Sequence, residues 1–218
     1  MSYTILIPIH NEADTISALL DGIELYADDN EILVVDDGST DGSYALLQKC
    51  SFLRLLRLDQ NSGKGVAICK GLAKATHNKI VISDGDMELD PREIDRLMIL
   101  EKEMGIHCVF GSRYRTINPF GSLWDFGNFF FTGLFNMVYG SNHSDALCCA
   151  KAFFRDDIDL EKISSSGFDI DIELATMLTR KIPSIDVVYL SYIRRSPNEG
   201  KKLRLRDGWI ILKRILRN

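Results

Sequence analysis

The sequence predicts an α/β protein, a single domain with a mostly parallel central sheet flanked by helices. Three observations lead to this prediction. Short β-branched apolar runs alternate with helical stretches over the first 115 residues, as in right-handed βαβ units. Polar and acidic residues follow the ends of several of these runs. No segment rich in glycine, serine or proline divides the 218 residues, so one domain is expected.

The first elements follow from the apolar pattern. Residues 3–9 form a β-branched run that ends in polar residues, which is typical of a buried strand. Residues 14–26 carry apolar side chains at helical spacing. A second buried strand is expected at 32–35, followed by D-D-G-S. Thr40 or Asp41 is then placed to cap a helix that runs to residue 50.

The same alternation continues to about residue 115. A third strand is expected at 53–58, a helix of small residues at 63–75, and a fourth strand at 79–83. Pro91 suits the first turn of a helix that should reach about residue 103. A fifth strand is expected at 107–110, after which the pattern becomes less regular.

Charge and cysteine content narrow the function classes. The formal net charge is −5, which disfavours general nucleic-acid binding. Residues 201–218 hold seven Lys or Arg and one Asp, a local charge of +6, so the rest of the chain carries −11. The five cysteines include no C-x-x-C pair and no zinc-site spacing, and we expect reduced thiols. The N-terminus resembles no signal peptide, which favours a cytoplasmic protein.

Acidic residues gather where parallel strands end. Asp36 and Asp37 follow the second strand, and D-G-D-M-E, residues 84–88, follows the fourth. In open parallel sheets ligands bind beyond the carboxyl ends of the strands. Adjacent carboxylates repel one another, so a cation should join them, and a divalent metal that carries a nucleotide diphosphate is the simplest candidate. The N-S-G-K-G run at 61–65 precedes a helix and could meet phosphates, or could be a turn with a solvated lysine; it is not a P-loop.

Together these segments resemble a known family. IPIHNEADTI resembles the P-x-Y-N-E opening of family 2 glycosyltransferases, and ILVVDDGSTDGS matches their nucleotide-binding segment. NSGKGVAICKGLAKA, ISDGDMELDP, GSRY, the stretch from Asp145 to Arg155 and FDIDIELATMLTRK resemble later motifs in the same order. The chain therefore resembles the GT-A-fold branch typified by dolichyl-phosphate mannose synthase and polyprenyl-phosphate sugar transferases, from about residue 3 to 205.

The resemblance implies roles for individual residues. Nucleotide-sugar contacts are implied for Pro8, His10, Glu12, Asp37, Lys64, Asp84, Arg195 and Lys202. The metal ligands for Mg²⁺ or Mn²⁺ would be Asp84, Asp86 and Glu88. The catalytic candidates are Asp86, Arg113 and Asp145, with Arg113 facing the transferred or acceptor phosphate. A basic cluster from Arg194 or Arg195 and Lys201 or Lys202 would close over the diphosphate.

The sequence departs from the family pattern at three places. His10 stands where tyrosine is usual, which would change base stacking. Glu88 is often glutamine in the mannose synthase branch. The late segment reads RRSPNEGKK, with altered spacing and without the usual serine.

The second half of the chain carries two amphipathic features. Residues 120–139 hold eight aromatics and one charge, Asp125, and are expected to form either a core helix or an apolar helix at the bilayer. They are too interrupted to span a membrane. Within 201–218, apolar Leu205, Trp209, Leu212 and Leu216 share a stripe beside basic residues. This helix either meets anionic lipid or packs on its own domain.

We therefore expect a nucleotide-sugar-binding half at 1–115, an acceptor half at 116–200 and a basic amphipathic helix at 201–218. The resemblance implies a metal-dependent inverting hexosyltransferase that uses a GDP- or UDP-sugar and a polyprenyl phosphate, peripheral at the cytoplasmic membrane face. One alternative is transfer to a sugar hydroxyl of a surface glycan, with Asp145, Asp169 or Asp171 as base. Another is a non-catalytic nucleotide-sugar-binding domain.

Overall fold

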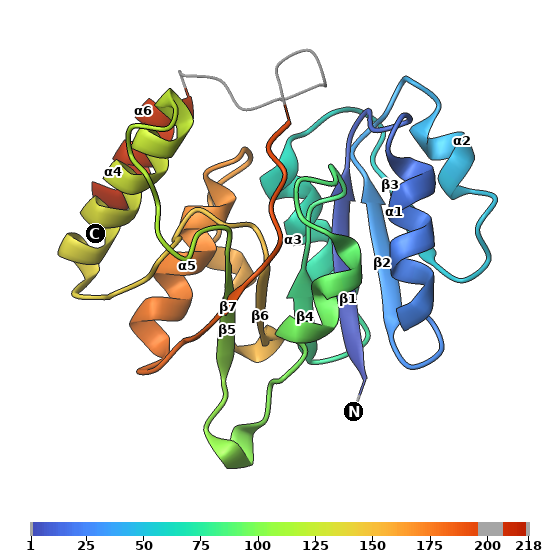
Figure 1. Ribbon diagram of the computed structural model, residues 1–218. Helices are drawn as coiled ribbons and strands as arrows, with labels where there is room; N and C mark the ends of the chain where they lie inside the picture. The colour runs from blue at the N-terminus through green and yellow to red at the C-terminus, as the bar shows by residue number, and fades with distance from the viewer. Residues whose placement is uncertain (1, 196–206, 217–218) are drawn as a thin grey trace.

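The structure is a computed structural model that describes residues 2–195 and 207–216 (Figure 1). A seven-stranded sheet in the order β3-β2-β1-β4-β6-β5-β7 runs through the molecule. The strands are β1 (Tyr3–Ile9), β2 (Glu31–Asp36), β3 (Arg54–Arg57), β4 (Lys79–Ile82), β5 (Cys108–Ser112), β6 (Lys151–Phe154) and β7 (Asp186–Tyr189). Neighbouring strands are parallel except where β6 pairs with β4 and with β5. The predicted mostly parallel sheet is confirmed.

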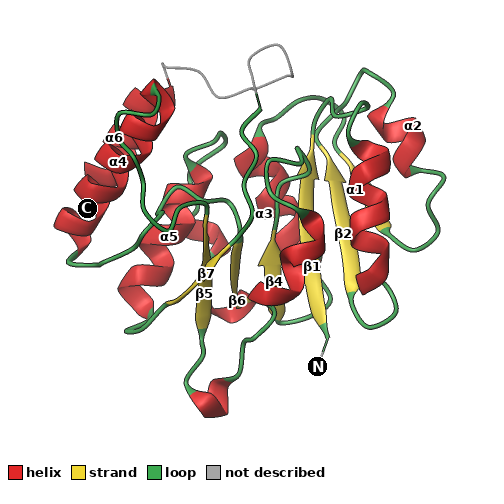
Figure 2. Ribbon diagram, in the orientation of Figure 1, coloured by secondary structure: helices red, strands yellow, loops and turns green. Residues whose placement is uncertain are grey.

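Helices cover both faces of this sheet (Figure 2). The α-helices are α1 (Ile16–Ile23), α2 (Ser43–Leu47), α3 (Lys64–Lys74), α4 (Leu123–Tyr139), α5 (Ile170–Lys181) and α6 (Asp207–Leu216). Short 3₁₀ turns are η1 (Glu24–Tyr26), η2 (Pro91–Leu97), η3 (Lys102–Met104), η4 (Arg155–Asp157) and η5 (Leu160–Lys162). Each connection between the first parallel strands passes over the sheet, as the βαβ pattern requires.

Alternation along β1 divides the core into two layers. Leu6 belongs to the apolar cluster that includes residues of α3, α5 and α6, whereas Ile5 and Ile7 belong to the cluster on the other face, with residues of α1 and η2. All three side chains are fully buried, as expected for a central parallel strand covered on both sides. The sheet is thereby fixed between two apolar layers, and its polar strand ends remain at one edge.

The segment after Pro91 differs from the prediction. It forms η2 and η3 rather than one α-helix to residue 103. The backbone groups between them find other partners: the Leu100 N–H donates to the Tyr3 hydroxyl at 2.8 Å, and Glu101 forms a β-bridge with Ile106. These tertiary contacts replace the i to i−4 hydrogen bonds of an α-helix.

The helix after D-D-G-S is also shorter than predicted. Its N-cap is Gly42 in a left-handed conformation, not Thr40 or Asp41. The Asp41 carboxylate nevertheless accepts from the Ser43 N–H at 3.0 Å, so it satisfies one free amide of the first turn.

The two amphipathic helices pack against each other at one end of the sheet (Figure 1). In α4 only Asn128, Thr132 and Phe135 are buried. In α6 the buried side chains are Ile211 and Ile215, while Trp209 of the predicted stripe is 69% exposed. The helix therefore docks on its own domain through a face different from the one the sequence suggested. Within residues 2–195 and 207–216, no helix has the length and apolarity needed to cross a bilayer.

Candidate active site

The carboxyl ends of β1, β2 and β4 open into a cleft of about 1090 Å³. Most of the predicted site residues, taken from the strand ends and from the family resemblance, line it. These are Pro8, His10, Glu12, Asp37, Lys64, Asp84, Asp86, Glu88, Arg113 and Arg195. Asp145 lies just behind the wall, and Lys201 and Lys202 lie outside the described residues. The structure thus brings these residues together around one cavity.

Asp37 organises the end of the cleft nearest β2. Its two carboxylate oxygens accept from the N–H groups of Ser62 (2.7 Å) and Gly63 (2.8 Å), which fixes the loop before α3. Gly63 has φ +97°, and a Cβ there would lie 2.2 Å from the Ser166 carbonyl oxygen, so only glycine fits. The N-S-G-K-G run is thus a tight turn tied to the D-D-G-S strand end.

His10 is held rigidly beside Asp37. Its Nδ1 lies 2.7 Å from the Asp37 carbonyl oxygen, and its Nε2 lies 2.8 Å from the Asn61 amide nitrogen. These two contacts fix the ring at the mouth of this end of the cleft. Asn61 is the first residue of the N-S-G-K-G run, so this turn is tied to His10 as well as to Asp37.

Three acidic residues follow β4. The half-buried Asp86 carboxylate accepts from the Glu88 N–H at 3.0 Å, a turn made possible by Met87 at φ +61°. Burial, together with the nearby carboxylate of Asp84, raises the pKa of Asp86 to about 7. A nearby cation stabilises the ionised form of such a carboxyl group, because it offsets both the burial and the repulsion from Asp84. A bound divalent ion would supply that positive charge. The donor set of Asp84, Asp86 and Glu88 fits Mg²⁺ or Mn²⁺, although no group of three metal-ligating side chains is preassembled within the described chain.

Lys64 joins Asp84 to the start of α5. Its Nζ lies 2.8 Å from Asp84 Oδ1 and 2.8 Å from Asp171 Oδ2. Burial lowers the pKa of Lys64, but the carboxylates of Asp171 and Asp84 outweigh it and hold that pKa well above its usual value. The other oxygen of Asp171, Oδ1, is buried without a hydrogen-bond partner, and burial raises the pKa of this carboxyl group.

The three acidic residues around the start of α5, Asp169, Asp171 and Glu173, have two different roles. Arg214 of α6 binds Asp169 Oδ2 at 2.6 Å and Glu173 Oε1 at 2.6 Å, so both of these carboxylates anchor the last helix. Asp171 alone of the three lines the cleft. Of the two candidate bases in this segment, Asp169 is thus committed to Arg214.

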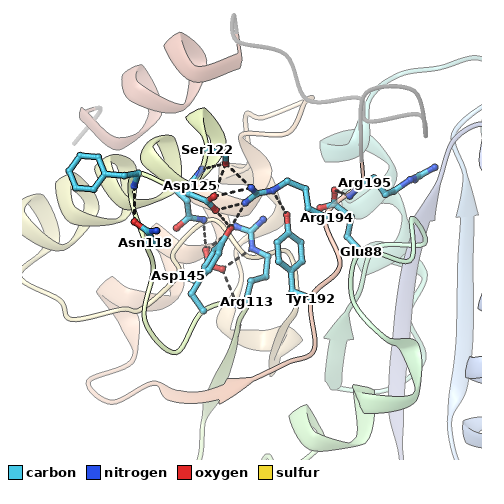
Figure 3. Close-up of polar contacts among 12 residues, drawn as sticks. Glu88, Arg113, Asn118, Ser122, Asp125, Asp145, Tyr192, Arg194 and Arg195 are labelled. Atoms are coloured by element: carbon cyan, nitrogen blue, oxygen red, sulfur yellow. Dashed lines mark hydrogen bonds and ion pairs between the residues drawn. The ribbon is translucent and has the colours of Figure 1, made fainter.

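A buried ion pair forms the opposite wall. Arg113 donates from Nε (2.8 Å) and Nη2 (2.9 Å) to the Asp145 carboxylate, which also accepts from the Asn128 amide at 2.8 Å (Figure 3). Asp145 is 2% exposed. Burial alone would raise the pKa of Asp145, but Arg113 lowers it below its ordinary value. A carboxylate held this way is a weak proton acceptor, and its geometry serves to orient Arg113.

Two consecutive arginines cross the top of the site after β7 (Figure 3). Arg195 Nη1 lies 2.8 Å from Glu12 Oε2, and its N–H donates to Glu88 Oε1 at 3.0 Å. Arg194 turns the other way and binds Asp125 and Ser122 at the start of α4. This short segment therefore connects the acidic end of the cleft to the helix that forms its far wall.

Residues 4–160 match the model of Glycosyl transferase family 2. The chain belongs to this family. It is 29% identical over 219 residues to glycosyltransferase AglJ of Haloferax volcanii, a match that covers 98% of this chain and 70% of that protein. It is 33% identical over 109 residues to the undecaprenyl-phosphate 4-deoxy-4-formamido-L-arabinose transferase of Yersinia pestis, which covers 46% of this chain and 33% of that protein.

Solved structures of glycosyltransferases share the fold. Mannosyl-3-phosphoglycerate synthase from Rubrobacter xylanophilus superposes with a TM-score of 0.79 at 18% identity, covering all of this chain and 72% of that one. Glucosyl-3-phosphoglycerate synthase from Mycobacterium tuberculosis, in complex with Mn²⁺, UDP-glucose and glycerol 3-phosphate, gives 0.74 at 21% identity, with 99% and 79% covered. The predicted GT-A fold and the prediction of a glycosyltransferase are both confirmed.

Proposed function

We propose that this glycosyltransferase moves a hexose from a GDP- or UDP-sugar to a polyprenyl phosphate, with metal dependence and inversion at the anomeric carbon. One observation carries the proposal: the cleft has two chemically different ends. One end holds the carboxylates and Lys64 at the strand ends. The other is lined by aromatic and aliphatic side chains from α4 and α6, namely Leu123, Trp124, Phe126, Phe130, Phe131, Trp209 and Leu212.

The polar end suits a nucleotide-sugar. The Asp37 carboxylate and the fixed His10 ring offer an acceptor and a flat surface to a nucleobase and ribose, next to the turn at 61–65. A divalent ion held by Asp84, Asp86 and Glu88 would offset the negative charge of the leaving diphosphate. Arg195, now on Glu12, lies within the same cleft and would add positive charge there. The manganese and UDP-glucose complex of a structural relative supports this use of the fold.

The apolar end suits a lipid acceptor. Arg113 lines the cleft together with these apolar side chains and is held by the buried Asp145, so its guanidinium is fixed in advance. We infer that it binds the acceptor phosphate and aligns it with the anomeric carbon. A phosphate monoester is largely ionised at neutral pH, with a second pKa of about 6, so it attacks without a general base. Direct attack opposite the leaving diphosphate inverts the anomeric configuration.

An exposed apolar surface adjoins this end. Phe120 (90% exposed), Leu123, Phe126 and Phe129 (52%) on and before α4, with Trp209 on α6, form what we call the aromatic face. Contiguous exposed aromatics at this density mark an interaction surface. We propose that the aromatic face rests on the cytoplasmic side of a membrane, which brings the lipid phosphate to the cleft. The name of the undecaprenyl-phosphate relative supports this acceptor class.

A second candidate acceptor is a sugar hydroxyl. The buried, unpartnered Oδ1 of Asp171 favours it, because a hydroxyl nucleophile needs a base and the raised pKa of Asp171 suits that role. Asp145 does not fit this role, since Arg113 and Asn128 occupy it.

A paired-acceptor assay tests the proposal. A panel of UDP- and GDP-sugars with Mg²⁺ or Mn²⁺ is offered together with a short polyprenyl phosphate and a hydroxyl-bearing glycan. We expect transfer to the lipid phosphate and retention of that transfer in Asp171→Asn. Transfer only to the glycan, abolished in Asp171→Asn, would refute the lipid acceptor and establish the alternative.

A further inference from the structure

A second, smaller cavity shares Arg113 with the main cleft. It has a volume of about 190 Å³ and is lined by Arg96, Arg113, Arg115, Tyr189, Leu190 and Ser191. Arg96 comes from η2, Arg113 and Arg115 follow β5, and Tyr189 ends β7, so three separate segments build it. We call it the arginine pocket. Half of its lining residues are arginines, although the whole chain carries a net charge of −5.

The positive charge in this pocket is only partly balanced. Arg115 is exposed, with its guanidinium carbon 5.4 Å from the centre of the Tyr189 ring, and within the described residues no carboxylate forms an ion pair with it. Arg113 donates from Nε and Nη2 to Asp145, so Nη1 is available for another acceptor. Because Arg113 and the buried Asp145 cancel, the excess charge comes from the other two arginines.

The nearest acid is already in use. The Glu93 carboxylate accepts hydrogen bonds from the Ser191 N–H at 2.6 Å and from the Ser191 hydroxyl at 3.1 Å. Its hydrogen bond from Arg96 Nη1 is longer, at 3.2 Å. The Arg96 side chain is 44% exposed, and an ion pair this exposed is weak. Glu93 therefore shapes the floor of the pocket at Ser191 more than it neutralises the arginines.

We propose that the arginine pocket binds a phosphate-sized oxyanion. Guanidinium groups present forked donors that match phosphate oxygens, and each of the three here keeps N–H donors beyond the hydrogen bonds described above. The cavity equals roughly six water volumes at about 30 Å³ each, enough for one phosphate group and a few waters but not for an extended polyanion. The anion is either free inorganic phosphate or the phosphate head of a lipid, and both present the same oxygens. This assignment stands on the pocket geometry and does not rest on the proposed acceptor.

Titration of the free protein with inorganic phosphate tests the site. Arginine Nε–H resonances are followed by NMR at constant ionic strength, with chloride as the replaced anion. The double variant Arg96→Gln/Arg115→Gln should weaken phosphate affinity about tenfold or more, because charge-assisted hydrogen bonds are lost. Arg92→Gln is the matched control, since Arg92 lies on the same turn but pairs with Asp90 outside the pocket. Unchanged affinity in the double variant, or an equal loss in the control, would overturn the proposal.

A second measurement distinguishes the two sources of the anion. If the pocket seats a lipid head, Arg115→Gln raises the KM for a short polyprenyl phosphate without changing the affinity for the nucleotide. If the pocket takes free phosphate, that KM is unchanged although phosphate binding is lost. Failure of transfer to the lipid in the wild-type protein would refute the proposed function, but phosphate binding by the arginine pocket would be measured independently.

Discussion

The buried pair of Arg113 and Asp145 gives the most demanding test of how the cleft is built. We expect Asp145→Ala to destabilise the fold strongly and to slow transfer, while nucleotide affinity stays close to that of the wild type. Asp145 is fully enclosed, and the Arg113 side chain is only 19% exposed, so water cannot replace the lost partner. The variant leaves a guanidinium and the Asn128 amide without their common acceptor.

The size of the effect follows from this burial. Removing one partner of a buried ion pair costs roughly 3–5 kcal/mol, because the remaining charge is uncompensated. A folded domain has a total stability of roughly 5–15 kcal/mol, so Asp145→Ala should fold with a clearly reduced urea midpoint. Removing both charges in Arg113→Ala/Asp145→Ala should destabilise less than the sum of the single variants, by a coupling of roughly 0.5–3 kcal/mol.

Urea unfolding of the wild type, both single variants and the double variant measures this coupling. Lys162→Gln serves as the control, because its ion pair with Asp159 is at the surface and its loss should leave the urea midpoint unchanged. Calorimetry with the nucleoside diphosphate measures donor affinity separately, since Asp145 does not line the cleft. Additive single-variant effects, or a loss below about 1 kcal/mol for Asp145→Ala, would contradict a buried pair that orients Arg113.

Three further outcomes are expected. Asp37→Ala should weaken nucleotide binding by roughly 1–3 kcal/mol, as the carboxylate that holds the 61–65 turn is lost; unchanged calorimetric affinity would move the base site elsewhere. Burial, with a contribution from Lys151, lowers the pKa of His143 to about 4, against 6.5 when unfolded, so stability should fall as the pH drops from about 6.5 through 4. His143→Gln should flatten that pH dependence of the thermal midpoint; an equal slope in the variant would assign it to other groups. Phe129→Glu/Trp209→Glu should reduce sedimentation with anionic liposomes, whereas Met104→Glu, at a side chain on η3 that is also exposed, should not; equal binding by both would remove the aromatic face from the membrane contact.

The parts of the fold that repeat locally were predictable. The strands β1, β2, β4 and β5 appear where short apolar runs stand, because each is buried on both faces. β3 also lies within its predicted range, but as an edge strand it is exposed at Arg54 and Arg57. β6 and β7 were not predicted. They lie after residue 115, where the alternation of strands and helices that marks the earlier strands ends; β6 reads KAFF and runs antiparallel to its neighbours, and β7 reads DVVY with its first two residues exposed. Which strands pair across the sheet depends on contacts far apart in the chain, such as Ile82 opposite Lys151.

In the candidate site too, local features were predictable from the sequence and long-range contacts were not. Strand-end carboxylates were found in the sequence because their place at the sheet edge follows from the topology alone. Their partners were not, because Lys64 meets Asp171 across 107 residues and Arg113 meets Asp145 across 32. Only the folded chain could show that Arg214 engages Asp169 and leaves Asp171 in the cleft.

The cleft is completed by residues that lie after position 160, where the match to the family model ends. Asp171, the two arginines after β7, and Trp209 all belong to this later stretch and all line the cavity. Membership of the family is thus decided by residues 4–160, whereas part of the cleft wall, at both its polar and its apolar end, comes from residues beyond them. A graft of residues 161–218 from a relative would therefore change both ends of the cleft at once, because Arg195 lies beside Glu12 at the acidic end and Trp209 lies at the apolar end.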